Sequence, residues 1–259
     1  MTATLSPSVG AAHLDRPTRP SVIRRVALGV TALLSCALPT TFLVATVAQL
    51  ATGTEADHRF HQVTGQGLLL CVLWLGALVP LLVSGWRGTA PSAGTALQAA
   101  AVAVTGLIAG AIAPGAGGLA LAVYAAVTTG LVWAVLPVRP RLRGELTGLD
   151  PVIAPITLLG TALLTPFITG ELHKQNHVHD EHTDMAHYFD MAWVSPIIVV
   201  LGVVAALVPS ARRRAYWLTG GLVLIGATRM AFTPDVTWSL LAMALGAAGS
   251  VALVLRDRR

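Results

Sequence analysis

The stretch MAWVSPIIVVLGVVAALV, residues 191–208, carries no charged side chain and decides how this chain folds. A helix of about 20 apolar residues crosses the hydrocarbon core of a membrane. The apolar residues here are continuous rather than alternating, which argues against the strands of a membrane β-barrel. Eight runs of this kind each predict one membrane-spanning helix: residues 26–50, 67–86, 96–113, 119–136, 151–169, 191–208, 215–232 and 236–255.

The composition supports a surface that faces lipid. Of the 259 residues, 54% are hydrophobic and only 11% are charged, whereas soluble domains carry roughly a quarter of charged residues. The net charge is +5, but the arginines form short clusters between apolar runs. No basic stripe interleaved with aromatic residues occurs, which excludes nucleic acid as a partner. The sequence therefore predicts an all-α polytopic membrane protein.

Lysine and arginine mark the cytoplasmic ends of membrane spans. Of the 17 such residues, 14 fall on one side of the eight-span layout. We therefore expect a multi-pass protein of the cell membrane with both termini in the cytoplasm. Residues 1–25 are expected to form a disordered cytoplasmic tail, and the run that follows is too long for the apolar core of a signal peptide. Seven of the eight histidines then lie outside the cytoplasm.

Two of the outer segments resemble each other. Thr54-Glu-Ala-Asp-His-Arg-Phe-His61 aligns without gaps on Thr183-Asp-Met-Ala-His-Tyr-Phe-Asp190, at an offset of half the chain. The match predicts two four-helix units, residues 26–137 and 151–259, joined by a cytoplasmic linker at 138–150. An even number of spans in each unit makes the repeats parallel, related by an axis along the membrane normal.

The repeated segments also place candidate ligands on common faces. If each segment is helical where it enters the next span, residues three apart share a face. Such stripes at the mouth of a four-helix bundle are typical positions for cofactor or metal ligands. The two stripes are Glu55, His58 and His61 in the first half and Asp184, His187 and Asp190 in the second.

The outer loop 170–190 carries further histidines, found in one half only. Imidazole together with carboxylate suits ions such as Zn²⁺ or Cu²⁺. The spacing matches no recognised closed site, so a solvated loop that binds metal only adventitiously remains the alternative. The candidate metal ligands are His61, His173, His177, His179, His182, Asp184 and Asp190.

Arg229 lies near the outer end of the seventh run. A charged residue at membrane depth indicates a functional site. Its partner is expected to be Asp235, an acid of the outer loop, or an anionic ligand group such as a propionate. The alternative is a side chain that only extends to the interface.

At Glu55-x-x-His58-Arg59 the sequence resembles the haem A synthase family, which is similar in its eight spans, two four-helix halves and cytoplasmic termini. The resemblance implies that Glu55 is catalytic, that His58 and His187 bind haem iron, and that Arg59 is the arginine of the motif. The family oxidises a haem methyl group. Its second histidines, near the outer ends of spans four and eight, are absent here. Whether His61 replaces one of them stays open.

Three classes of function follow. The first is a haem-binding membrane protein; if it is an enzyme, it is a haem-modifying oxidoreductase, with haem-handling or respiratory-oxidase assembly proteins as partners. The second is a non-enzymatic transporter or assembly factor for Cu or Zn. The third is a structural protein whose outer loop docks a partner.

Overall fold

The structure is a computed structural model that describes residues 21–53, 56–65, 67, 69–140, 146, 148–233 and 235–258. Every regular element in these ranges is a helix. The longer helices are α1 Val22–Thr52, α3 Leu69–Arg87, α4 Ala93–Ile112, α5 Gly118–Val135, α6 Ile153–His177, α8 His187–Leu207, α9 Ala215–Phe232 and α10 Val236–Asp257. The short ones are α2 Ala56–Thr64, η1 Gly115–Gly117, α7 Glu181–Asp184 and η2 Pro209–Arg214.

Seven helical stretches of the described chain are long and apolar enough to cross a membrane, and one of them, His58–Arg87, runs through both α2 and α3. Each of the eight expected spans coincides with a helix. Helix α9 is the expected span that falls outside the set of seven; it is 18 residues long and contains Arg229. The fold is thus that of a helical integral membrane protein.

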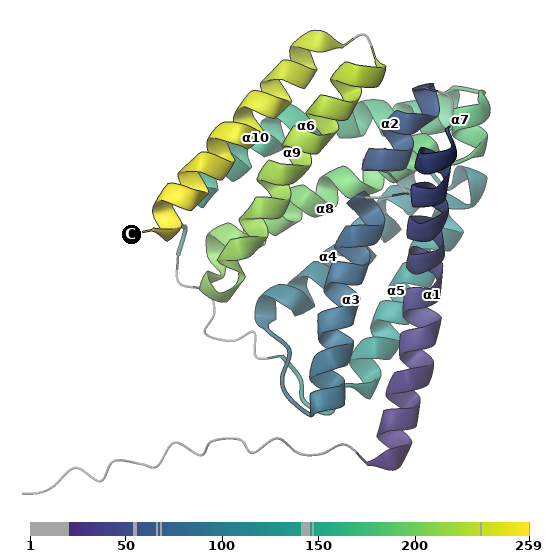
Figure 1. Cartoon of the computed structure of the whole chain (residues 1–259), viewed down its shortest axis with the longest axis vertical. Coiled ribbons are helices and arrows are strands. Elements are labelled where there is room, and N and C mark those ends of the chain that lie inside the picture. The colour runs from purple at the N-terminus through teal and green to yellow at the C-terminus, as the bar shows by residue number, and fades with distance from the viewer. Residues whose placement is uncertain are drawn as a thin grey trace, which may run out of the picture.

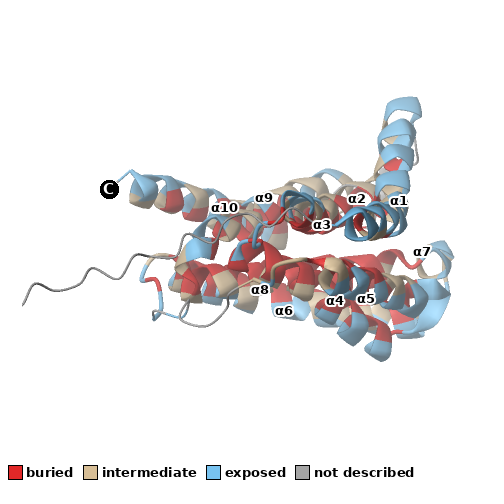
Figure 2. Ribbon diagram, turned by 90° about the horizontal axis from the view of Figure 1, so that it is seen from below, coloured by how far each residue is buried: buried red, intermediate tan, exposed pale blue. Residues whose placement is uncertain are grey.

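The helices form two layers, seen most clearly in Figure 2. One layer contains α1, α3, α9 and α10, and the other contains α4, α5, α6 and α8. Helix α8 is the most enclosed: it packs against α4, α6 and α9, and most of its residues are buried. Helices α9 and α10 form an antiparallel hairpin (Figure 1), and α4 and α5 are joined by the single 3₁₀ turn η1.

The segment expected as an outer loop, 170–190, is mostly helical. Helix α6 continues to His177, α7 spans Glu181–Asp184 and α8 begins at His187. The extension of α6 carries a Glu171–Lys174 ion pair between residues one turn apart, an arrangement that stabilises a helix. The apolar run ends at residue 169, but the helix continues through polar residues to His177. The expected end at residue 169 is therefore wrong by about two turns.

The expectation of a disordered tail over residues 1–25 is wrong for residues 22–25. Helix α1 begins at Val22, and the Ser21 hydroxyl accepts a hydrogen bond from the backbone N–H of Arg24 as its N-cap. Residues 1–20 lie outside the described residues, as do 141–145 and 147 of the expected linker.

Candidate functional site

Helix α2 presents two histidines to the interior of the bundle. His58 and His61 are three residues apart, and the rings of both lie within 5.5 Å of the His187 ring. The neighbouring Phe60 is buried in the core and fixes this face inward, while Arg59 is half-buried. The shared face predicted for His58 and His61 is confirmed, but Glu55, the expected catalytic residue, lies outside the described residues.

A turn between α7 and α8 sets the other side of the site. Ala186 has a φ of 57°, a left-handed conformation that ends α7 and redirects the chain into α8. His182 lies on α7, and His187 is the first residue of α8. The expected stripe of Asp184, His187 and Asp190 is therefore wrong at its first member: Asp184 is exposed, whereas His187 and Asp190 are buried.

Four imidazoles meet between α2, α7 and α8. The rings of His58 and His182 are stacked at a centroid distance of 4.9 Å, and those of His61 and His187 at 5.0 Å. His58 and His187 meet edge to face at 5.4 Å. The ligand nitrogens of His58, His182 and His187 all lie within 4.8 Å of one another, so these three side chains could hold one metal ion.

The remaining loop histidines do not join this cluster. The His173 and His177 rings stack on each other at 4.2 Å, and His177 Nδ1 lies 2.9 Å from the His173 carbonyl oxygen. Both are exposed, as is His179. The division of the outer histidines into a repeat-related pair and a separate loop group is therefore corrected, because His182 of the loop lies beside His58 and His187.

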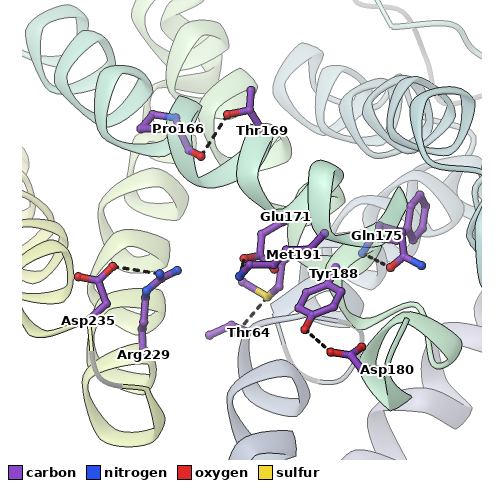
Figure 3. A network of polar contacts seen from close by, with 12 residues as sticks. Thr64, Pro166, Thr169, Glu171, Gln175, Asp180, Tyr188, Met191, Arg229 and Asp235 are labelled. Carbon is purple, nitrogen blue, oxygen red and sulfur yellow. Dashed lines mark hydrogen bonds and ion pairs between the residues drawn. The ribbon is translucent and has the colours of Figure 1, made fainter. Parts of the chain in front are cut away.

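Two acids hold α7 in place beside the site. Asp180 Oδ1 accepts the backbone N–H of Thr183, and Asp180 Oδ2 accepts the Tyr188 hydroxyl at 2.8 Å (Figure 3). Burial alone would raise the pKa of Asp180, but these hydrogen bonds hold it below the ordinary value. Glu181 Oε1 lies 3.9 Å from His58 Nε2, a contact that is ionic only when the imidazole is protonated.

The buried amide of Gln175 links α6 to both histidine-bearing segments. Its Nε2 donates to the Thr183 carbonyl at 2.9 Å, and its Oε1 accepts the Phe189 N–H at 3.0 Å. These two hydrogen bonds fix the backbone at Thr183, one residue after His182, and at Phe189, two residues after His187. Sequence reasoning missed Gln175, and the signal available was a neutral amide between two histidines, His173 and His177; its place two residues before the end of α6 is known only from the structure.

A pocket of 290 Å³ adjoins the cluster. His61 and His182 form one wall, and Glu171, Lys174 and Arg229 are among the other lining residues. Glu171 is 3% exposed; its Oε1 accepts from Lys174 at 2.8 Å. Its Oε2 has no hydrogen-bond partner among the described residues. Glu171 was not among the candidate site residues that the sequence suggested.

Arg229 has the first of its expected partners. One guanidinium nitrogen donates to Asp235 Oδ2 at 3.0 Å (Figure 3), and Asp235 also caps α10 by accepting the Trp238 N–H. The guanidinium carbon lies 5.0 Å from the ring centroids of both Phe167 and Trp238, a geometry that favours a cation. Arg229 is thus held at the pocket by α6 and α10.

Asp190 is the most enclosed acid near the site. It is fully buried, and neither carboxylate oxygen has a hydrogen-bond partner in the described part of the chain. A Cβ added at Gly65, in the break between α2 and α3, would lie 3.2 Å from the Asp190 Cβ. The absence of a side chain at Gly65 lets this break approach the carboxylate closely.

Haem does not fit between these histidines as they are arranged. The four rings pack on one another with centroid distances of 4.9–5.6 Å, which leaves no slot for a flat macrocycle between two of them. The adjoining pocket of 290 Å³ is at the lower limit of sites for drug-sized ligands, roughly 300–1,000 Å³. A single ion could be held by His58, His182 and His187 without moving these rings apart.

If the histidine cluster binds a metal ion, removing the Gln175 amide should weaken that binding. Groups that orient ligand-bearing segments typically contribute about 10–100-fold to metal affinity. We expect a Gln175→Ala variant to bind Zn²⁺ at least tenfold more weakly in a competition titration. The matched control is Asn176→Ala, whose exposed amide donates to the Ile112 carbonyl; equal loss in both variants would contradict the role of Gln175.

Comparisons of the chain with protein-family models, curated proteins and solved structures give no match. The class of protein is defined by the fold and the site: a helical integral membrane protein with a cluster of histidines at one end of its bundle.

Proposed function

We propose that this protein binds one transition-metal ion through His58, His182 and His187 at the extracytoplasmic end of the bundle. The observation that carries the proposal is the mutual distance of their ligand nitrogens, all within 4.8 Å. The three residues come from α2, α7 and α8, so they meet only in the folded chain. By contrast, His173 and His177 lie one turn apart on the same helix, so their stacking does not depend on contacts between different helices.

The ligand set favours zinc or copper. Imidazole nitrogen suits Zn²⁺ and Cu²⁺, and three histidines leave a zinc ion with a fourth position for water or substrate. This open position would adjoin the pocket, since His182 belongs to both the triad and the pocket wall. A metal site of this kind would serve a metal-binding protein, a metal carrier or an enzyme.

Two buried acids close to the triad support a cation at this site. Asp190 is buried one turn from His187 on the same helix, and Glu171 lines the adjoining pocket with one oxygen unbonded among the described residues. Burying a carboxylate without a partner is costly. An ion of charge +2 near these groups would offset that cost.

The membrane topology of the proposal has eight spans in two repeated units, with both termini in the cytoplasm of a cell-membrane protein. Matching helix pairs support the repeat: α1 packs on α3 as α6 packs on α8, and α4 packs on α5 as α9 packs on α10. Close packing supports α9 as a span, because a Cβ at Gly226 would lie 2.7 Å from the Ser239 carbonyl oxygen of α10. Small residues at helix contacts are typical of membrane bundles.

Haem A synthase-like chemistry is the second candidate, supported by the position of His58 and His187 in opposite halves and by Arg229 at the pocket. It would require the four rings to separate by several ångströms to admit haem. Binding of haem-handling or respiratory-oxidase assembly proteins belongs to this candidate. The ion is preferred because it needs no such rearrangement.

Metal analysis of the purified protein tests the proposal. We expect about one Zn²⁺ or Cu²⁺ per chain in the wild type, and loss of most of it in His58→Ala, His182→Ala and His187→Ala variants. The matched control is the double variant His173→Ala/His177→Ala, which should keep its metal. Equal metal content in all variants would reject the triad. A Soret band after haem addition that disappears in His58→Ala would favour the second candidate.

A further inference from the structure

The end of the bundle away from the histidines carries a basic pocket. It has a volume of 490 Å³, and its lining includes Arg212 and Arg213 of η2 together with Arg256 and the Asp257 carboxylate of α10. The sequence predicts that this end faces the cytoplasm. Arg213 is exposed and forms no ion pair with any residue that the structure describes.

Asp150 fixes the other two guanidinium groups. Its Oδ2 lies 3.3 Å from Arg212 Nε and 2.7 Å from an Arg256 guanidinium nitrogen, while its Oδ1 accepts the N–H groups of Val152 and Ile153. The carboxylate is 5% exposed. Two cations are therefore held in place around one buried acid, with Arg213 beside them.

An apolar groove of 520 Å³ lies beside Asp150, whose backbone N–H donates to the carbonyl oxygen of Ala206 in the groove lining. Leu149 and Leu158 form one wall and Val203 and Leu207 the other. Leu149 immediately precedes Asp150, and Leu207 lies two residues before Pro209, which lines the basic pocket. Leu149 and Leu158 are 68% and 70% exposed, so this groove opens onto the face that lipid covers.

We infer that the pocket and groove together bind one anionic phospholipid. The phosphate would lie in the basic pocket beside Arg213, and an acyl chain would lie along the groove between α6 and α8. Basic pockets at the ends of membrane helices are suited to anionic headgroups. The groove adds an apolar surface that a free phosphate ion cannot use, and the arginines add a charge preference that a zwitterionic lipid cannot satisfy.

Thermal unfolding in detergent with added ligand tests the inference. Three ligands are compared: phosphatidylglycerol, phosphatidylcholine of the same chain length, and inorganic phosphate. We expect only phosphatidylglycerol to raise the midpoint of unfolding at low lipid-to-protein ratio, with a bound lipid retained in native mass spectrometry. An equal rise with phosphatidylcholine, or with inorganic phosphate, would overturn the inference.

Two variants separate the site from general charge attraction. Arg213→Ala should weaken phosphatidylglycerol binding about fivefold, the equivalent of about 1 kcal/mol for one arginine near a lipid surface. Leu158→Gln, at an exposed groove position, should weaken it as well. The control is Arg258→Ala, an exposed cation at the same end that does not line the pocket; an equal effect of Arg258→Ala would contradict a defined site.

Discussion

An Asp150→Ala variant is expected to lose about 3 kcal/mol of its free energy of unfolding. Asp150 caps the start of α6 and pairs with Arg212 and Arg256. Loss of a helix cap costs about 1 kcal/mol, and a hydrogen bond to a charged group contributes about 1.5–3 kcal/mol. Because the two arginines are partly exposed, water can solvate them in the variant, which limits the loss.

Denaturant unfolding in detergent micelles measures this effect. Asp257→Ala is the matched control, because Asp257 accepts from Arg256 and from the Tyr216 hydroxyl at the protein surface. Exposed pairs of this kind contribute less than about 1 kcal/mol. If both variants lose the same amount, Asp150 is not a structural centre of this end of the bundle.

The contribution of Asp150 should also depend on pH. Burial alone would raise its pKa, but the N–H groups of Ile153 and Val152, together with Arg256 and Arg212, lower the pKa below the ordinary value. A carboxyl whose folded-state pKa is lowered stabilises the protein fully above its unfolded-state pKa of about 3.9. The stability difference between wild type and Asp150→Ala should therefore shrink as the pH falls below about 4; a difference that persists at lower pH would exclude the ionised carboxylate as its cause.

A Gly106→Val variant should be destabilised by about 3 kcal/mol, at the upper end of the effect of overpacking. Gly106 of α4 lies against the Trp193 ring of α8, and a Cβ there would come within 2.5 Å of the Trp193 Cε2 atom. The ring cannot turn away freely, because its Nε1 donates to the Val102 carbonyl of α4 at 2.9 Å. The added side chain must therefore push the two helices apart.

Gly130→Val is the control for this substitution. Gly130 lies on an exposed face of α5, and a Cβ at this position would meet nothing within 4 Å. The Gly130→Val substitution changes the side chain and the helix propensity in the same way as Gly106→Val, but it adds no steric contact. Equal unfolding midpoints for the two variants would contradict the close α4–α8 contact that joins the halves of the chain.

The positions of the helices could be predicted from the sequence because hydropathy and helix breakers act locally. The run 215–232 coincides with α9, and the hairpin at Gly115–Gly117 lies where glycines follow a proline. What failed was the end of α6, because its last two turns are polar. There the helix is maintained by side-chain pairs and by the Gln175 hydrogen bonds rather than by hydropathy.

The composition of the site could be predicted only in part. His58 and His61 were placed on one face by their spacing. The addition of His182 depends on Ala186, whose left-handed backbone no local pattern indicated. Which helices pack side by side could not be predicted from the sequence either. Membrane helices are apolar on most faces, so the periodicity of their apolar residues does not indicate which face contacts a neighbouring helix. The contact of α2 with α9 is one such pairing.

His58 belongs to the first half of the chain, and His182 and His187 belong to the second. An ion bound by all three would therefore be a cross-link that forms only after the chain has been made as far as His187 and α2, α7 and α8 have docked. Any ligand that binds the folded state alone stabilises it, by about 2.7 kcal/mol at 100 times its dissociation constant. The concentration of available metal would then control the lifetime of the folded protein. The bound ion could also hold together a chain that is cleaved between α5 and α6.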